Sequence, residues 1–154
     1  MEMRRKDRMI SQEEINESLK NAEYGVLSSV SVDGIPYGTP VNFVHIENAI
    51  YFHSATEGHK LNNFAANPNV SFTVVDSVEL MPARFSTKYR SVIAFGQVKL
   101  LEDDEERRAA LKALLEKLTP DFMESGMKYI DSSIDKTKVY KMEITTISGK
   151  SNKG

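Results

Sequence analysis

A short run of polar residues lies where an apolar strand gives way to a helical segment. His53 and Ser54 close the strand, and Gly58 lets the chain turn. His59 and Lys60 then open the helix. The first N–H groups of a helix lack intrahelical partners and carry a partial positive charge, which suits an anion such as a phosphate. Lys60 would add a full charge there, although a polar helix start with a solvated lysine also explains the pattern.

Other kinds of chemistry find less support in these residue types. A metal site needs several converging ligands, but His53 and His59 are six residues apart and no acidic residue is clearly placed to complete a set. Ser54 follows His53 directly in a strand, so their side chains point to opposite faces and do not form a nucleophile–base pair. No glycine-rich phosphate loop or dinucleotide-binding glycine motif follows a strand. The cluster is therefore either an anion site without a metal or an ordinary polar turn.

Composition narrows the classes of function. The chain has 154 residues, of which 40% are hydrophobic and 27% charged, with a net charge of −2 and no cysteine. This length fits one domain over residues 1–154, with an N-terminal arm at 1–10 and a polar tail at 148–154. The charge gives no footprint for nucleic acid, and the lack of cysteine excludes disulfides and thiolate catalysis. Because no apolar run could span a membrane and no signal peptide is visible, we expect a cytoplasmic protein without a membrane partner.

The N-terminal arm carries the one cluster of basic residues, which are Arg4, Arg5, Lys6 and Arg8. A solvated tail is the simpler interpretation of such a run. The alternative is a basic arm that touches a ligand or a partner.

The rest of the sequence predicts the elements that must position the polar cluster. Helices are expected where capping residues and apolar spacing coincide, over residues 12–21, 60–67, 103–119 and 121–129. Strands are expected from apolar and β-branched runs, over residues 24–32, 37–46, 49–54, 70–76, 89–101 and 137–147. Residues 77–88 show no period and are expected to form a long loop, of a kind that is often functional.

Single residues refine this pattern. The pair Asp33-Gly34 is a strong hairpin signal between the first two strands. Pro36 and Pro40 lie in the second strand, so we expect its first half to be at a sheet edge or bulged, because proline cannot donate to the ladder. Gly96 within a strand indicates a bulge or a close approach by another backbone or a ligand. Six antiparallel strands with helices between them give a mainly β, α+β fold, and we expect a small closed barrel that can hold a ligand at its rim.

Four segments, taken together, resemble the pyridoxamine 5′-phosphate oxidase-like FMN-binding split-barrel superfamily. They read PYGTPVNF at 36–43, IYFHSA at 50–55, GHK at 58–60 with NP at 67–68, and YRSVIAFG at 89–96. Within the superfamily the chain looks most like the Nim group, the 5-nitroimidazole resistance proteins, and the resemblance covers about residues 11–150. It implies a six-stranded antiparallel split β-barrel and a homodimer with two FMN sites at the subunit interface.

The resemblance also implies which residues contact each part of FMN. The strand–turn–helix segment would supply the phosphate contacts, from His53, Ser54, Ala55, His59 and Lys60. Two other strands would line the isoalloxazine ring, with Pro40, Val41, Asn42, Ser91 and, through its backbone, Val92. If a protein side chain takes part in the chemistry, His53 is the candidate as a proton donor near the flavin.

The chain departs from the pyridoxamine 5′-phosphate oxidases proper in two places. They carry two adjacent basic residues at the helix start, where this chain has His59 and then Lys60. Residues 147–154 also lack the arginine-rich substrate motif of those enzymes. We therefore expect weaker or pH-dependent charge compensation of the phosphate, and no oxidation of pyridoxine phosphate.

Four functions remain open at this point. The leading one is an FMN-dependent oxidoreductase that reduces nitroaromatic or other small electron acceptors, with NADH or NADPH as candidate electron donors. A flavin-binding carrier or sensor without turnover would use the same FMN contacts. The same fold could instead hold haem, which needs an axial ligand such as a histidine, or deazaflavin. A structural barrel without a cofactor is the fourth.

Overall fold

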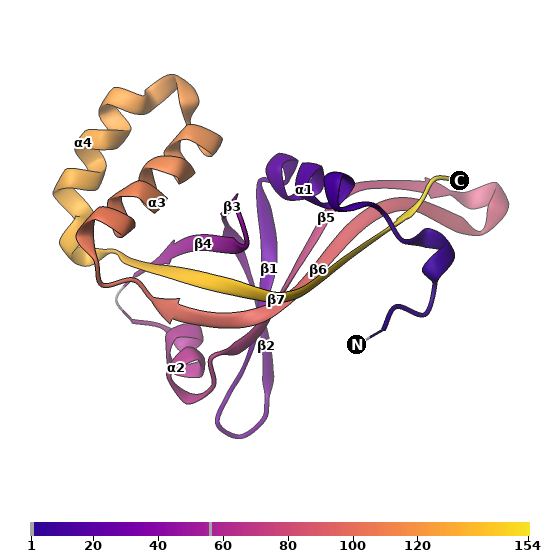
Figure 1. Cartoon of the computed structure of the whole chain (residues 1–154), viewed down its shortest axis with the longest axis horizontal. Helices are drawn as coiled ribbons and strands as arrows, with labels where there is room; N and C mark the ends of the chain where they lie inside the picture. Colours follow the sequence, from indigo (N-terminus) through magenta and orange to yellow (C-terminus); the bar gives the residue numbers. More distant parts are fainter. Residues whose placement is uncertain (1, 56) are drawn as a thin grey trace.

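A curved antiparallel sheet of seven strands forms the frame of the molecule (Figure 1). The computed structural model describes residues 2–55 and 57–154, so Met1 and Thr56 lie outside the described residues. The strands are β1 (Tyr24–Val30), β2 (Pro36–Asn42), β3 (Val44–Ile46), β4 (Ala49–Ser54), β5 (Asn69–Met81), β6 (Ser86–Leu100) and β7 (Lys138–Asn152). They pair in the order β2-β1-β5-β6-β7-β4-β3.

Two helices lie on opposite sides of the sheet, and two more lie together at one end (Figure 1). They are α1 (Gln12–Asn21), α2 (His59–Ala66), α3 (Asp104–Leu118) and α4 (Met123–Ser133), with short 3-10 turns η1 (Lys6–Arg8), η2 (Pro82–Arg84), η3 (Pro120–Phe122) and η4 (Ile134–Lys136). The capping box predicted at the start of α1 is confirmed, since the backbone N–H of Glu14 donates to the Ser11 hydroxyl. No helix in the described residues is long and apolar enough to cross a membrane.

The sheet differs from the closed six-stranded barrel that the sequence predicts. The expected strand over 37–46 is interrupted at Phe43, which gives β2 and β3 and a total of seven strands. These two strands are the edges of the sheet, because β2 pairs with β1 and β3 pairs with β4. No ladder joins the edges within the described residues, so the sheet curls round its core without closing. The expected edge position of the strand that holds Pro36 and Pro40 is confirmed.

Phe43 shows why the strand breaks. Its side chain is fully buried and meets the Phe72 ring edge-on, with ring centroids 4.8 Å apart. Its carbonyl oxygen accepts a hydrogen bond from the Lys117 side chain of α3, at 3.0 Å, and not from a neighbouring strand. A side chain 74 residues away therefore takes the place of a ladder partner.

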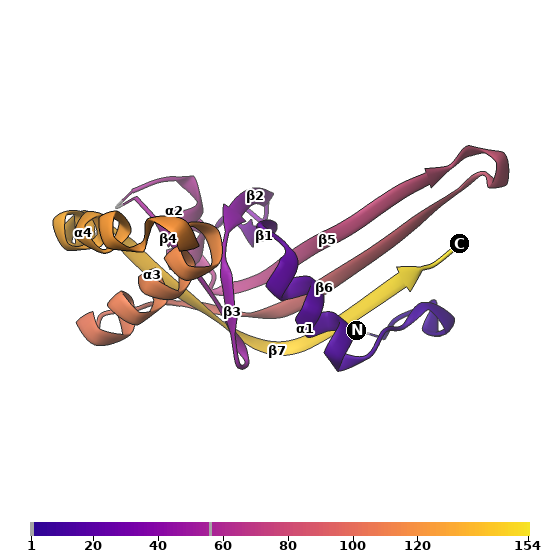
Figure 2. The same ribbon diagram turned by 90° about the horizontal axis from the view of Figure 1, so that it is seen from above.

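Residues 77–88 form a hairpin arm, so the expectation of a long loop is wrong. Strands β5 and β6 continue as a paired ribbon that turns at η2 and Phe85 and projects from the body of the molecule (Figure 2). A bulge between Val75 and Ser77 lets the extra residue, Asp76, form an ion pair with Arg90 at 2.5 Å. This bulge shifts the alternation of faces, which hides the strand from a search for a regular period.

Strand β7 also runs further than expected and includes residues 148–152 of the predicted polar tail. The amide of Asn152 donates to the Thr87 carbonyl oxygen at 2.6 Å, which fixes the end of β7 to the arm. The bulge expected at Gly96 is confirmed, since the β6–β7 register shifts there and an added Cβ would lie 1.9 Å from the Glu143 carbonyl oxygen.

Two apolar clusters stabilise these elements. The first fills the curled sheet together with apolar residues of α1 and α2, and it includes the fully buried Leu27 and Phe52. The second joins α3 and α4 to the far end of the sheet and includes Leu114 and Val139. The hairpin arm of β5 and β6 and the α3–α4 pair project from opposite ends of the molecule (Figures 1 and 2).

Candidate ligand-binding site

The start of α2 presents backbone N–H groups that no side chain caps. Gly58, the N-cap residue, has a φ of +153° in a region that is open to glycine and costly for other residues. Helices α1 and α3 are capped by Ser11 and Asp103, whereas α2 has neither a capping side chain nor an acidic residue in its first turn. The free N–H groups and the charge of Lys60 therefore favour an anion at this point.

The start of α2 lies against the edge strand β2. The rings of Tyr37 and His59 are tilted at 59° to each other, with centroids 4.6 Å apart. A second contact connects the helix to β1, where the buried amide of Asn63 donates to the Ser29 hydroxyl at 3.0 Å. Because β2 has only one neighbouring strand, its outer edge offers unpaired backbone groups beside the α2 start.

The three candidate residues of β2 play different parts. Pro40 and Asn42 are exposed, while Val41 is buried in the core and can offer a ligand only its backbone. The amide nitrogen of Asn42 donates to the Glu23 carbonyl oxygen at 2.8 Å, which leaves the amide oxygen as the group available to a ligand. Val92 of β6 is also a core residue, 1% exposed, so it too can offer a ligand only its backbone.

Pro40 and Ser91 share the outer face of the sheet. The register connects Pro40 to Val26, Val26 to Thr73, and Thr73 to Ile93, which lies two residues from Ser91 on β6. Cross-strand partners point to one face, and so do residues two apart in a strand. Three strand spacings separate β2 from β6, or roughly 14 Å, so these two parts of the predicted ring site do not touch within one chain.

Ser91 lies at a cavity of about 310 Å³ on this outer face. The cavity is lined by Glu2, Met3, Arg4, Ser91, Ile93, Phe95, Ser148, Gly149 and Lys150. The N-terminal arm therefore forms part of its wall, which the local sequence could not reveal. The run of basic residues was the one signal that pointed to the arm.

His53, Ser54 and Ala55 line a different cavity, of about 320 Å³, between the end of β4 and the α3–α4 pair. Its body is apolar, with Leu111, Leu114, Leu115, Leu118 and Ile130. The hydroxyl of the buried Ser54 donates to the Ala55 carbonyl oxygen at 2.8 Å and is therefore already engaged. The backbone of His53 belongs to the β4–β7 ladder, where it faces Val139, while its imidazole makes no hydrogen bond to another described residue.

The His53 ring has a lowered pKa although the residue remains exposed. Atoms crowded around the ring lower the pKa by desolvation, and the positive charge of Lys60 lowers it further. The imidazole is consequently neutral at pH 7, with one donor and one acceptor nitrogen. The structure thus gathers His53, His59 and Lys60 around the connection from β4 to α2, next to Tyr37 of β2, and leaves Ser91 and Val92 apart.

The chain matches the family described as pyridoxamine 5′-phosphate oxidase over residues 11–151. No curated protein gives a significant match.

Solved structures cover nearly the whole chain. A proposed 5-nitroimidazole antibiotic resistance protein from Bacteroides thetaiotaomicron is 29% identical, with a TM-score of 0.78 over 93% of this chain and 86% of its own. The flavocytochrome Anf3 from Azotobacter vinelandii is 20% identical, with a TM-score of 0.84 over 99% of this chain and 73% of its own. A FAD-binding protein from Mesorhizobium loti is 24% identical, with a TM-score of 0.65 over 94% of this chain and 97% of its own.

Proposed function

This chain belongs to the pyridoxamine 5′-phosphate oxidase family, and we propose that it binds FMN and reduces small electron acceptors, among them nitroaromatic compounds of the 5-nitroimidazole type. The observation that carries the proposal is the uncapped start of α2, with Lys60 in its first turn, beside the open edge of β2. The names of the three similar structures support it, since two describe flavoproteins and one a nitroimidazole resistance protein.

The residues at the α2 start fit the phosphate of FMN. The phosphate would accept hydrogen bonds from the free N–H groups of the first helical turn and a charge-assisted bond from Lys60. Gly58 keeps the approach open, because nothing lies within 4 Å of the position that a Cβ would take. His59, held against Tyr37, is placed to add a further donor.

The edge strand β2 fits the ring of FMN. Its unpaired backbone groups can hydrogen-bond the polar edge of a flat ring, and Pro40 can pack against the ring face. The hydroxyl oxygen of Thr39 on the same strand is buried and has no hydrogen-bond partner among the described residues. Because Thr39 points to the same face as the buried Val41 and away from Pro40, this hydroxyl faces the core and not the ring.

Bound flavin would supply the electron chemistry, and the protein would hold and shield it. Lys60 and the α2 start fix the phosphate, and β2 orients the ring. His53 remains the candidate for handling a proton. Because its pKa is lowered, it would act as a neutral imidazole that donates from one nitrogen and accepts at the other.

We also propose a homodimer with FMN at the subunit interface. The separation of Ser91 from α2 within one chain favours a site completed by a second copy. The hairpin arm of β5 and β6 carries exposed apolar side chains that a second copy would cover, namely Val78, Leu80 and Phe85. Phe85 is 97% exposed. Large exposed apolar patches of this kind are typical of protein interfaces.

Purified protein tests the proposal directly. We expect a flavin absorption spectrum, release of FMN on heating, and oxidation of NADH or NADPH when a 5-nitroimidazole or a quinone is added. Flavin fluorescence is easy to isolate, because the chain has no tryptophan. A Soret band without a flavin spectrum would show that the cofactor is haem and not FMN. Bound FMN without turnover of any of these acceptors would favour a carrier or sensor.

A further inference from the structure

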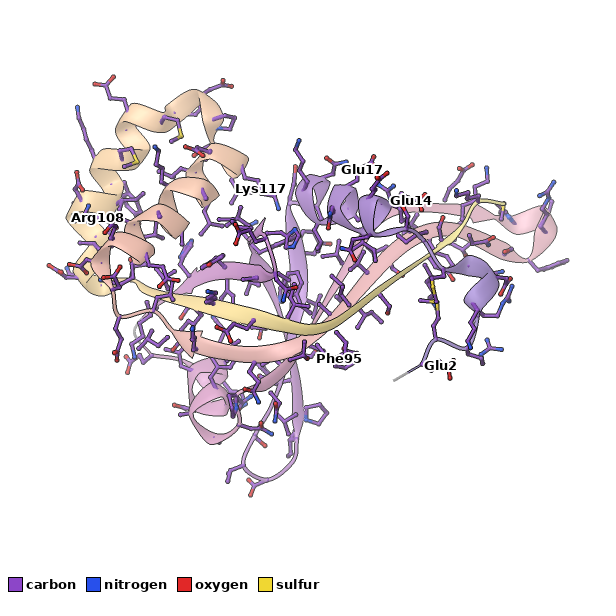
Figure 3. All side chains as sticks on the ribbon, in the orientation of Figure 1. Glu2, Glu14, Glu17, Phe95, Arg108 and Lys117 are labelled. Atoms are coloured by element: carbon purple, nitrogen blue, oxygen red, sulfur yellow. The ribbon has the colours of Figure 1, made fainter. Side chains whose placement is uncertain are left out.

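The N-terminal arm is fixed against the sheet at several points. The backbone N–H of Ile10 donates to the Gly149 carbonyl oxygen at 3.1 Å, and Met9 forms a β-bridge with Lys150. The Arg8 guanidinium donates to the Tyr89 hydroxyl at 3.3 Å. Figure 3 shows Glu2 of this arm and Phe95 of β6 on the same side of the β7 ribbon. The arm therefore has a defined course across the outer face.

Three of its four basic residues already have partners. Arg5 forms two hydrogen bonds with the Asp7 carboxylate, at 2.6 and 2.8 Å. Lys6 forms an ion pair with Glu2, and Arg8 contacts Tyr89. Arg4 makes no hydrogen bond or ion pair with another described residue, yet it lines the cavity that contains Ser91. Among the described residues, Arg4 is therefore the basic residue of the arm whose side chain has no protein partner.

The cavity around Arg4 has the character of a site for a flat, partly apolar ring. Ile93 and Phe95 supply an apolar floor and remain partly exposed. Ser91 and Ser148 add hydroxyl groups, and Lys150 adds a second cation, which lies 5.6 Å from the Tyr89 ring centroid. Opposite charge is confined to Glu2, which Lys6 already neutralises. The surroundings therefore favour a ligand that carries or gains negative charge.

We propose that, in the homodimer, the N-terminal arm of one copy forms a wall of the flavin ring site on β2 of the other copy, and that Arg4 of this arm stabilises the negative charge that the ring gains on reduction. This inference rests on the proposed function, because it requires bound FMN. Two-electron reduction with uptake of one proton leaves the ring one unit more negative. A cation beside the ring stabilises that charge, and apolar walls strengthen the interaction by lowering the local dielectric constant.

The reduction potential of the bound flavin tests the proposal. We compare FMN-loaded wild type, Arg4→Ala and Arg4→Lys by reductive titration against a reference dye. Arg108→Ala is the matched control, since Arg108 is exposed on α3, at the end of the molecule away from the N-terminal arm (Figure 3). We expect Arg4→Ala to weaken binding of reduced relative to oxidised FMN about tenfold, which lowers the two-electron potential by about 30 mV. Arg4→Lys should restore part of the shift.

The outcomes separate this inference from the function on which it rests. If Arg4→Ala binds FMN but has the same reduction potential as wild type and Arg108→Ala, Arg4 does not act on the ring and the inference is wrong. If the wild type binds no FMN, the proposed function itself fails. If Arg4→Ala lowers the reduction potential and Arg4→Lys recovers part of it, the effect comes from the positive charge. A purely structural role of the N-terminal arm would not depend on the charge at this position.

Discussion

The imidazole of His59 packs against the phenol ring of Tyr37, with ring centroids 4.6 Å apart. This contact fixes the start of α2 to the open edge of β2, so the two candidate halves of a flavin site are mechanically coupled. The helix would hold the phosphate and the strand would orient the ring. Neither element alone offers both kinds of contact.

Removal of Tyr37 should loosen this coupling. Aromatic pairs contribute about 0.5–1.5 kcal/mol beyond their buried area, so we expect Tyr37→Ala to weaken FMN binding by roughly 2–10-fold. Flavin fluorescence titration measures the change. Phe122→Ala removes another exposed ring, at η3, and should leave the affinity unchanged. Equal affinity of Tyr37→Ala and wild type would show that the contact does not support the site.

Gly58→Ala should damage the same site through the backbone. An alanine at a φ of +153° is strained by about 1–3 kcal/mol, and relief of that strain would move the free N–H groups of α2. Ala65→Gly is the matched control, because it destabilises the exposed face of α2 by about 1 kcal/mol without touching its start. Urea unfolding and FMN titration are measured for both. An equal loss of FMN affinity in the two variants would contradict the account.

The hairpin arm of β5 and β6 should govern dimerisation. We expect Leu80→Ser with Phe85→Ser to weaken dimerisation at least about tenfold, because each exposed apolar side chain would lose its burial against a second copy. Light scattering during gel filtration over a range of concentrations measures this. Val32→Ser, in the exposed turn between β1 and β2, serves as the control. A wild type that stays monomeric at every concentration would refute the dimer.

Lys117 should give the stability a pH dependence at the alkaline end. Its amine donates to the carbonyl oxygens of Phe43 and Leu19, and desolvation lowers its pKa to about 8. The unfolded lysine titrates near pH 10.5, so the unfolded state binds more protons between these values and the Lys117 contribution to stability rises with pH.

The test compares wild type with Lys117→Met by urea unfolding from pH 7 to pH 10. We expect the difference in unfolding free energy to move in favour of the wild type by about 1–2 kcal/mol over this range. Lys112→Met, on the exposed face of the same helix, should show a constant difference. Parallel pH profiles for wild type and Lys117→Met would exclude this role.

The sequence predicts the elements whose signals are local. Ser11 and Glu14 define the start of α1, and Gly96 marks its bulge, because each depends on neighbouring residues or on a steric rule. The break at Phe43 depends on Lys117, which approaches from another element. The hairpin arm of β5 and β6 depends on a bulge at Asp76 and on pairing with the end of β7. The alternation of inward and outward side chains is therefore irregular in its sequence.

The candidate site divides in the same way. His53, Gly58 and Lys60 form a local cluster, and their residue types alone are compatible with an anion site or with an ordinary polar turn. The contact between Tyr37 and His59 and the position of Arg4 beside Ser91 arise only when distant strands and the N-terminal arm meet. Such contacts leave no spacing in the sequence that a local pattern could detect.

The central claim is that Lys60 and the α2 start bind the phosphate of FMN, and comparison of FMN with riboflavin tests it most directly. We expect apo wild type to bind FMN about 10–100-fold more tightly than riboflavin, since a charge-assisted bond contributes about 1.5–3 kcal/mol. Lys60→Ala should lose most of this preference, while Lys128→Ala, on α4, should keep it. Equal affinity for FMN and riboflavin in the wild type, or an unchanged preference in Lys60→Ala, would contradict the account.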